Sequence, residues 1–234
     1  MRCVGGLGLA IALLTASCAA VEDVTRQLPA ATRPIKYRLA GADPELGRNL
    51  DQGWAQLKDG NHLRAVGALN RALWDLERIE TRWLRLEDLA EAHRALADAY
   101  GALRRASWAD DHRRLSQALA ESARRDPPVA SPEATLGRGR DAYARAQFRD
   151  AVIVLGQAVV DLEAVTYPPA RVKLLEEVRC YLAFAYFALD ELDRARDELE
   201  RVWALDPSLS FCAKMASPAI RRLIADVQRQ PGPR

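Results

Sequence analysis

The chain of 234 residues is poor in lysine, and its charges are close to balanced. Only four of its 34 basic residues are lysine, and 32 acidic residues leave a net charge of +2 at pH 7. Such a balance gives no strong electrostatic attraction to nucleic acid or to an anionic membrane surface. The preference for arginine is better explained by a GC-rich genome than by phosphate recognition. We therefore expect no nucleic-acid partner.

Cysteine and histidine are too few and too scattered to form a metal site. No Cys-x-x-Cys spacing occurs, which argues against structural zinc. His62, His93 and His112 have no carboxylate or cysteine partner at metal-ligand spacing, so we expect exposed helix residues without a metal. For Cys180 and Cys212 we expect two unpaired, mostly buried thiols. The alternative is a disulfide between them, formed in an oxidising compartment.

Sequence motifs of catalysis are also missing. The chain has no Gly-x-Ser-x-Gly, no phosphate-binding Gly-x-x-x-x-Gly-Lys and no His-Glu-x-x-His. Paired acids such as Glu176 and Glu177 are adjacent in sequence, so on a helix they point to different sides. We predict a protein that is not an enzyme, with no cofactor and no small-molecule substrate.

No apolar run is long enough to anchor the chain as a permanent transmembrane helix. The longest lies at the amino terminus, from Val4 to Leu14, well short of the roughly 20 residues that span a bilayer. Thr15-Ala16-Ser17 and then Cys18 follow it. Residues 1–18 resemble a bacterial lipoprotein signal peptide, although the aliphatic residue of that pattern, Leu14, lies one place early.

This resemblance implies cleavage after residue 17 and lipidation of Cys18. Several acyl chains on Cys18 would then anchor the protein to a membrane. With Ala19 rather than aspartate next, we expect an outer-membrane lipoprotein facing the periplasm. The alternative is an ordinary secretory signal, cut between Ala16 and Ala20, that leaves a soluble periplasmic protein. Residues 18–42 contain two prolines and no sustained period, which predicts an extended tether; a short strand around Ile35 to Leu39 is the alternative.

What the sequence has in abundance is helical pattern, and that pattern is duplicated. Asp43-Pro44-Glu45 is a good helix start, and Ser131-Pro132 and Ser217-Pro218 repeat it. Shifting the chain by 86 residues aligns the segment beginning at Gly53 with the one beginning at Gly139, through a shared Asp-Leu-Glu. The match breaks after Arg105, where we expect Ser107 to Asp110 to open a displaced helix as a capping box.

The stretch from Leu182 to Pro207 has small and bulky apolar residues at fixed helical spacing and closes with Asp-Pro. It resembles a complete tetratricopeptide repeat, a helix-turn-helix unit that stacks into scaffolds. The resemblance implies an all-α fold, a right-handed α-solenoid of about four such units. We place them at residues 44–79, 82–127, 132–165 and 168–207, and assign 208–234 to a capping helix, from Pro218 to about Arg229, and a tail.

In that family the first helix of each unit lines a groove that takes a partner's peptide or helix. Carried over to this chain, the resemblance implies a groove formed by Trp54, Arg94, Asp98, Arg140, Tyr143, Phe184 and Phe187. Phe184 and Phe187 are the best candidates, because other residues already form the core stripe of their helix. The alternative is that both pack beneath the terminal helix or a neighbouring unit.

We therefore expect a lipid-anchored scaffold that binds another envelope protein and assists the assembly or localisation of an envelope machine. Pilotins of type IV pili or secretins and adaptors of gliding motility are built in this way, by resemblance. The alternative is an accessory regulator of a cell-wall hydrolase or synthase. A third possibility is a structural spacer without a ligand of its own.

Overall fold

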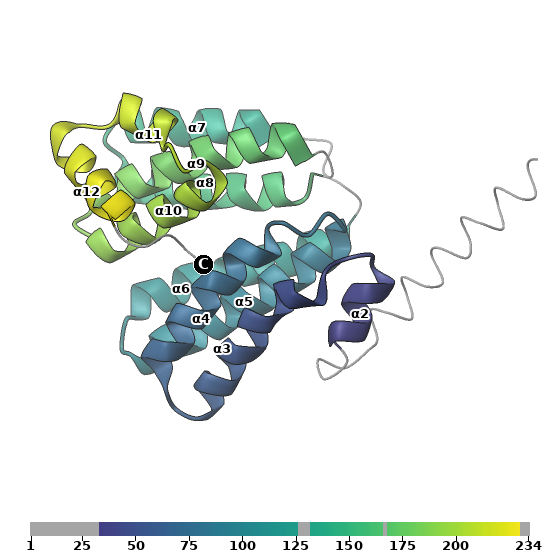
Figure 1. The fold of residues 1–234 in the computed structure, drawn as a ribbon. Coiled ribbons are helices and arrows are strands. Elements are labelled where there is room, and N and C mark those ends of the chain that lie inside the picture. Colours follow the sequence, from purple (N-terminus) through teal and green to yellow (C-terminus); the bar gives the residue numbers. More distant parts are fainter. Residues whose placement is uncertain (1–32, 126–131, 166–167, 230–234) are drawn as a thin grey trace, which may run out of the picture.

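The computed structural model describes residues 33–125, 132–165 and 168–229, and all regular secondary structure in these ranges is helical (Figure 1). The expected all-α class is thereby confirmed. Cys18, the rest of the signal segment and the first part of the expected tether lie outside the described residues. The elements are α2 (Arg33–Leu39), the 3-10 helix η2 (Pro44–Gly47), α3 (Arg48–Lys58), α4 (His62–Leu76), α5 (Arg82–Ala102), α6 (Ala106–Ala123), α7 (Pro132–Ala144), α8 (Phe148–Glu163), α9 (Pro168–Ala188), α10 (Leu192–Leu205), α11 (Ser210–Met215) and α12 (Pro218–Arg229).

Four helical hairpins form the body, and all four turn in the same way. They pair α3 with α4, α5 with α6, α7 with α8 and α9 with α10. Each turn passes through one residue of left-handed conformation: Gly60 (φ 74°), Arg104 (φ 59°), Ala146 (φ 58°) and Asp190 (φ 60°). The next residue then donates its N–H to a carbonyl five positions earlier, as Asn61 does to Gln56 at 2.8 Å. These hydrogen bonds satisfy carbonyls at the end of each first helix.

The expected capping box in the second hairpin does not form. Helix α6 begins at Ala106, so Ser107 lies inside its first turn, and no side chain caps the helix. The left-handed turn at Arg104 already starts the helix, at the position equivalent to the start of α10 in the duplicated half. The extra residues of this unit lengthen the other end of α6, which runs to Ala123.

Close packing within the first and third hairpins depends on a glycine in each. A Cβ added at Gly53 would lie 2.5 Å from the Leu69 side chain, and one at Gly139 would lie 2.5 Å from that of Leu155. Glycine therefore lets the paired helices approach until these leucines fill the space between them. The two contacts are equivalent under the 86-residue offset, so the duplication extends to the packing.

The duplicated halves, α3–α6 and α7–α12, face each other through their second helices. We call α3, α5, α7 and α9 the front helices and α4, α6, α8 and α10 the back helices. Between the halves, α6 packs on α8 and α4 meets α10. The 86-residue offset relates α6 to α10 and α4 to α8, so it turns the α6–α8 contact into the α10–α4 contact. The halves are therefore related by an approximate two-fold axis. In Figure 1 the front helices α3 and α7 lie on opposite outer sides of the molecule.

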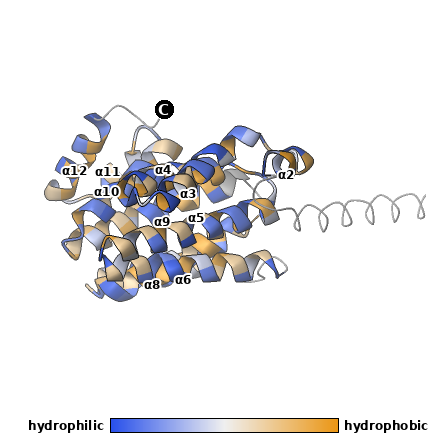
Figure 2. Ribbon diagram, turned by 90° about the horizontal axis from the view of Figure 1, so that it is seen from below, coloured by the Kyte–Doolittle hydropathy of each residue, from blue (hydrophilic) through white to orange (hydrophobic). Residues whose placement is uncertain are grey.

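A continuous solenoid would stack α7 against α6, whereas in the described part of the chain the back helices make the main contacts between the halves. The physical reason is that α8 is apolar on two sides. Leu155 and Leu162 belong to the core of its own half, while Val160 and, just after the helix, Ala164 belong to the core of the first half. In Figure 2 blue and orange residues alternate along α12 and other outer helices, as one-sided burial requires.

The expected tether is shorter than predicted, because its last part is the helix α2. Tyr37 is fully buried, Arg33 is 4% exposed, and the Tyr37 hydroxyl donates to Asp88 on α5 at 2.6 Å. Neither an extended segment nor the alternative strand forms at residues 33–39. Pro34 is tolerated because it lies in the first turn, where its missing N–H costs nothing.

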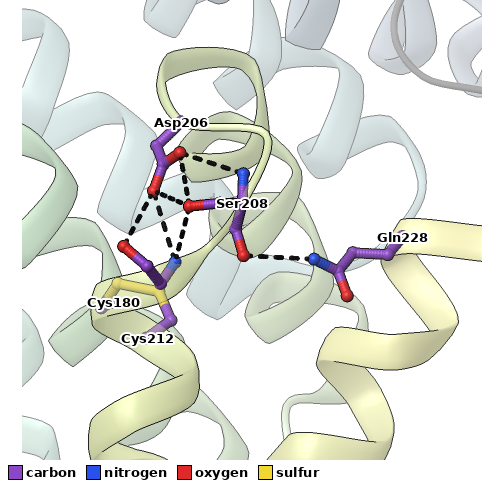
Figure 3. The surroundings of a disulfide bond; sticks show 6 residues. Cys180, Asp206, Ser208, Cys212 and Gln228 are labelled. Atoms are coloured by element: carbon purple, nitrogen blue, oxygen red, sulfur yellow. Dashed lines mark hydrogen bonds between the residues drawn. A yellow bond between two sulfur atoms is a disulfide. The ribbon is translucent and has the colours of Figure 1, made fainter.

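The carboxy-terminal helix α12 occupies the range predicted for the cap. Its apolar face is buried and packs on α10, through Ile220, Leu223, Ile224 and Val227. The short helix α11, which the sequence did not predict, packs against α9. Its Cys212 forms a disulfide with Cys180 of α9, with the Cα atoms 5.4 Å apart (Figure 3). The expectation of two unpaired thiols is therefore wrong, and the alternative holds, because the turn after α10 folds α11 back over α9.

Candidate functional site

The residues predicted for one groove come from both halves of the molecule. Trp54 of α3 and Arg94 and Asp98 of α5 belong to the front of the first half, and the other four belong to the front of the second. Between the halves, contacts are made by α6 with α8, by α4 with α10 and by α5 with α8. The single groove expected from the repeat pattern therefore stays a prediction.

The front of the first half keeps its predicted residues accessible. The Arg94 guanidinium lies over the Trp54 ring, 5.2 Å from its centroid, in a cation–π contact between α3 and α5. Arg94 and Asp98 are exposed, and Trp54 is half-buried. We call Trp54, Arg94 and Asp98 the first-half front surface. It presents an aromatic ring and charges of both signs.

The front of the second half is largely closed. Phe184 is 2% exposed, and the rings of Tyr143 and Tyr181 lie 6.3 and 6.1 Å from its ring. The expectation that Phe184 projects from the core is corrected, since it packs in the core that the disulfide-bonded α11 covers. Phe187 is half-buried against the same core. Arg140 is exposed and pairs with Glu177 across α7 and α9 at 3.1 Å.

Helix α2 lies on the first half, beside the first-half front surface. Ion pairs hold it on α3 and α5. Arg33 pairs with Asp51 of α3 at 2.8 Å, and with Asp88 and Glu91 of α5 at 3.1 and 3.0 Å. Burial alone would lower the pKa of Arg33, but these carboxylates raise it above its usual range. The front helices of the first half thus recognise a short helix that carries a buried cation and a tyrosine.

A second candidate is the cavity between the halves, which the sequence did not predict. Its volume is about 150 Å³, and residues of α5, α6, α8, α9 and α10 line it. The wall from α6 and α8 is mainly apolar, and the wall from α5, α9 and α10 is mainly polar. The apolar lining residues are Leu115, Ala118, Val152, Ile153, Gly156, Val159, Val160 and Leu182, and the polar ones are His93, Asp111, Arg114, Gln157, Arg179, Tyr186, Glu198 and Arg201.

Arg179 holds together the polar wall. It donates to Glu198 of α10 at 2.9 Å and pairs with Glu77 of the first half. Arg201 donates to Glu198 at 3.3 Å and to Asn70 of α4 at 3.4 Å. The Nε atoms of both arginines are buried without a hydrogen-bond partner. These two donors therefore lie within the protein without an acceptor.

Glu77 is the member of this cluster whose charge is most easily lost. Burial raises its pKa to about 7, against the attraction of Arg179. The pKa of Glu198 is lowered instead, because Arg201 and Arg179 outweigh the effect of its burial. One carboxylate of the cluster is thus held charged and the other titrates near neutral pH.

Two of the three histidines are buried, contrary to the expectation that all are exposed. His93 and His112 are 5% and 9% exposed, and their Nδ1 atoms lie 2.8 Å apart. Burial lowers the pKa of each well below 6.5, and nearby arginines lower it further. Both rings are therefore neutral at pH 7, one donating its Nδ1 proton to the other. Tyr100 stacks on His112 with centroids 5.3 Å apart.

A sequence signal for the polar cluster did exist. Ala195, Glu198, Leu199 and Val202 are spaced as the buried stripe of α10. A carboxylate inside such a stripe is buried with its helix face, so it requires a cation from another element. The sequence could not name Arg179 as that cation, because the pairing depends on how α9 packs.

No group of three or more His, Cys, Asp and Glu side chains in the described ranges could hold a metal ion. Among the helices described, none is long and apolar enough to cross a membrane. The chain matches no family model, no curated protein and no solved structure.

Proposed function

We propose that this chain is a lipid-anchored scaffold of the bacterial cell envelope, which binds another envelope protein and assists the assembly or localisation of an envelope machine of pilus, secretin or motility type. Its four hairpins are tetratricopeptide-like units, arranged as two pairs. Cys18 carries the lipid, and the body faces the periplasm.

The observation that carries the proposal is the packing of α2 on the front helices of the first half. A seven-residue helix is too short to be stable alone, so the front helices hold it through side-chain contacts. This face therefore has the chemistry to bind a helix. Trp54 and Arg94 lie about one helical turn beyond the Asp51 and Glu91 that hold α2, and Asp98 lies about one turn further along α5. We assign partner binding to that surface.

The disulfide supports the compartment. Disulfides persist in the periplasm and are rare in a reducing cytosol. Cys180 and Cys212 are both fully buried and bonded. Export through a signal peptide would supply the oxidising environment that this bond requires.

The anchor is tested by replacing Cys18 with serine and fractionating the cells. We expect the variant to leave the membrane fraction, because the acyl chains can no longer be attached. Cys3→Ser is the matched control and stays in the membrane fraction. Continued membrane association of Cys18→Ser, with the signal segment removed, would contradict lipid anchoring.

Partner binding is tested by placing a photo-crosslinking residue at Asp98 and, as control, at Arg113, which is exposed on back helix α6. We expect one dominant envelope protein from position 98 and none from position 113. Arg94→Glu with Trp54→Ala should abolish that product while the helical content stays unchanged. Crosslinks to a cell-wall hydrolase or synthase would favour the regulator instead, and equal products from both positions would contradict a dedicated surface.

A further inference from the structure

We propose that the outer side of α2 is a membrane-contact surface, which lies on the phospholipid bilayer that holds the lipid anchor. We call Pro34, Ile35, Arg38 and Leu39 the outer face of α2. The inference rests on the proposed anchor at Cys18, and it adds which side of the protein faces the lipid.

Helix α2 turns polar residues towards the protein and apolar residues towards solvent. Arg33 and Tyr37 are 4% and 0% exposed, whereas Ile35 and Leu39 are 52% and 53% exposed. A helix on the surface of a globular protein normally has the opposite arrangement, with its apolar stripe on the core. Ion pairs and a tyrosine hydroxyl hold the inner side of α2. Packing on the body therefore does not explain why the outer face is apolar.

The composition of the outer face suits a phospholipid surface. Ile35 and Leu39 are four positions apart, so they form one ridge on the helix, and Arg38 lies beside it. Arg38 is exposed and forms no ion pair within the described residues. Aliphatic side chains next to a cation are typical of helices that lie in the plane of a membrane interface. The aliphatic groups enter the boundary of the acyl chains, and the guanidinium binds a lipid phosphate.

The position of the anchor selects a bilayer as the occupant of this face. Cys18 lies 15 positions before Arg33, the first residue of α2. A chain of that length spans at most about 55 Å when fully extended. Since the chain reaches the described body at α2, the anchor keeps this element at a high effective concentration near the lipid. Figure 1 and Figure 2 show α2 at the opposite end of the molecule from α12.

The anchor and the outer face have different tasks. Two half-exposed aliphatic side chains do not hold a protein on a membrane by themselves, since even one myristoyl chain binds only marginally. The anchor supplies proximity, and the outer face sets the orientation. Trp54 and Arg94 lie about one helical turn beyond the residues that hold α2. This orientation therefore brings the first-half front surface, and the partner segment that it binds, close to the bilayer.

The experiment reads the surroundings of α2 with the environment-sensitive fluorophore NBD, attached to Ile35→Cys of the mature lipidated protein. The protein is held in vesicles of phosphatidylethanolamine and phosphatidylglycerol. Cys18 carries the lipid, and Cys180 and Cys212 form the disulfide, so the new thiol alone is labelled. We expect the emission to shift to the blue and to rise at least about twofold over that of the Cys18→Ser protein in buffer.

A label at Met215→Cys is the matched control. Met215 is 50% exposed, as Ile35 nearly is, and it belongs to α11, far from α2 in sequence and in Figure 1. Its emission should not change on the vesicles. An equal change at both positions, or no change at position 35 in vesicle-bound protein, would overturn the proposal.

A second variant tests the apolar ridge itself. With the label at Leu39→Cys, the further change Ile35→Glu should abolish the emission change, because a carboxylate on the outer face opposes contact with lipid. Leu63→Glu alters another exposed leucine, 74% exposed on α4, and should leave the emission change intact. Both replaced side chains are exposed, so the fold is retained, and circular dichroism checks this. An emission change that persists in Ile35→Glu would contradict the role of the ridge.

A chain held by a different anchor separates this inference from lipidation. Cys18→Ser with a hexahistidine segment in front of it is bound to the same vesicles through a nickel-chelating lipid. If Cys18 is not lipidated in cells, fractionation shows it, whereas the label at position 35 of this chain still reports contact with the bilayer. No change of emission in the nickel-held chain would overturn the membrane-contact surface and leave the anchor untouched. A change that follows protein concentration in buffer, without vesicles, would assign the outer face to a second copy and overturn the proposal as well.

Discussion

At the scale of single residues, the hairpin turns place side chains where glycine would be favoured. Gly60, Arg104, Ala146 and Asp190 share one left-handed conformation, and only the first is glycine. A residue with a Cβ loses about 1 kcal/mol or more in this region. The protein therefore tolerates the same local strain three times, in turns whose geometry the surrounding hairpin fixes.

Ala146→Gly should accordingly stabilise the protein. We expect the free energy of unfolding to rise by about 0.5–1 kcal/mol, since removal of the strain exceeds the added entropy of the unfolded chain. Gly60→Ala is the opposite change in an equivalent turn and should lower it by about 1 kcal/mol. Urea denaturation of the two variants measures both. Destabilisation by Ala146→Gly would show that the left-handed turn is not strained in solution.

The buried histidine pair predicts a specific dependence on pH. His93 and His112 are neutral in the folded protein, because their pKa values lie well below 6.5. In the unfolded chain both take up protons as the pH falls below about 6.5. The pair therefore leaves stability unaffected above that pH and lowers it progressively below, by up to about 1.4 kcal/mol per histidine and pH unit.

His93→Asn with His112→Asn removes this titration and keeps polar atoms near the Nδ1 positions. The comparison of wild type and variant is needed because Glu77, with a pKa raised to about 7, favours the folded state as the pH falls. We expect the stability of wild type, relative to the variant, to drop between pH 7 and pH 5. Urea denaturation at both pH values measures this drop. A constant difference would mean that the rings are charged or solvated.

At the scale of elements, the long amphipathic helices could be predicted and the short ones could not. Proline starts and helical spacing indicated α12 and the hairpins, because these helices are stabilised by their own periodic faces. Helices α2 and α11 have seven and six residues, too few for a period. Tertiary contacts form them: charges on α3 and α5 hold α2, and the disulfide holds α11 against α9.

The turn before α11 shows how that contact is prepared. The Asp206 carboxylate accepts from the backbone N–H and hydroxyl groups of Ser208 and Ser210, and Gln228 of α12 donates to the Ser208 carbonyl (Figure 3). Hydrogen bonds from Ser208 hold the pKa of Asp206 below its usual value. The chain is thus directed back over α9, which brings Cys212 to Cys180.

The disulfide should contribute a large part of the stability of the second half. Its cysteines are 32 residues apart, and a loop of this length corresponds to about 3–4 kcal/mol in the chain-entropy account. We expect Cys180→Ala with Cys212→Ala to lower the free energy of unfolding by that amount, and α11 to lose amide-exchange protection first. Wild type with a phosphine reductant should behave like the variant, and the reductant should not affect the variant. A loss below about 1 kcal/mol would contradict the role of the bond.

At the scale of the whole molecule, the duplication could be read from the sequence, and the way the two copies meet could not. Gly53 and Gly139 revealed the 86-residue offset because each copy needs the same glycine. The contact between the copies depends on Val160 and Ala164, which belong to the core of the other half. Nothing in their sequence spacing distinguishes them from the residues that face the core of their own half.

Reciprocal arginine contacts reinforce this interface. Arg85 of α5 donates to the Glu163 carbonyl at 2.7 Å, and Arg171, its equivalent on α9, donates to the Glu77 carbonyl at 3.0 Å. Burial lowers the pKa of Arg85 to about 10 despite its ion pair with Glu163, so it remains charged at neutral pH. Each half thus caps the end of a back helix of the other with a guanidinium, which favours one fixed arrangement of the two.

Arg179 should determine whether the halves unfold together. Arg179→Met leaves the carboxylate of Glu77 buried without its cation, and we expect a loss of about 3–5 kcal/mol. Adding Glu77→Leu should restore about 2 kcal/mol of it, because Glu198 keeps Arg201 as a partner.

The separation of the halves can be measured because four of the five tryptophans, all but Trp203, belong to the first half. In wild type, tryptophan fluorescence and far-ultraviolet circular dichroism should follow one urea transition. In Arg179→Met the fluorescence should change at lower urea than the circular dichroism, since the second half keeps its disulfide while the first loses a buried contact. Coincident transitions in that variant would show that the apolar contacts of α8 alone couple the halves.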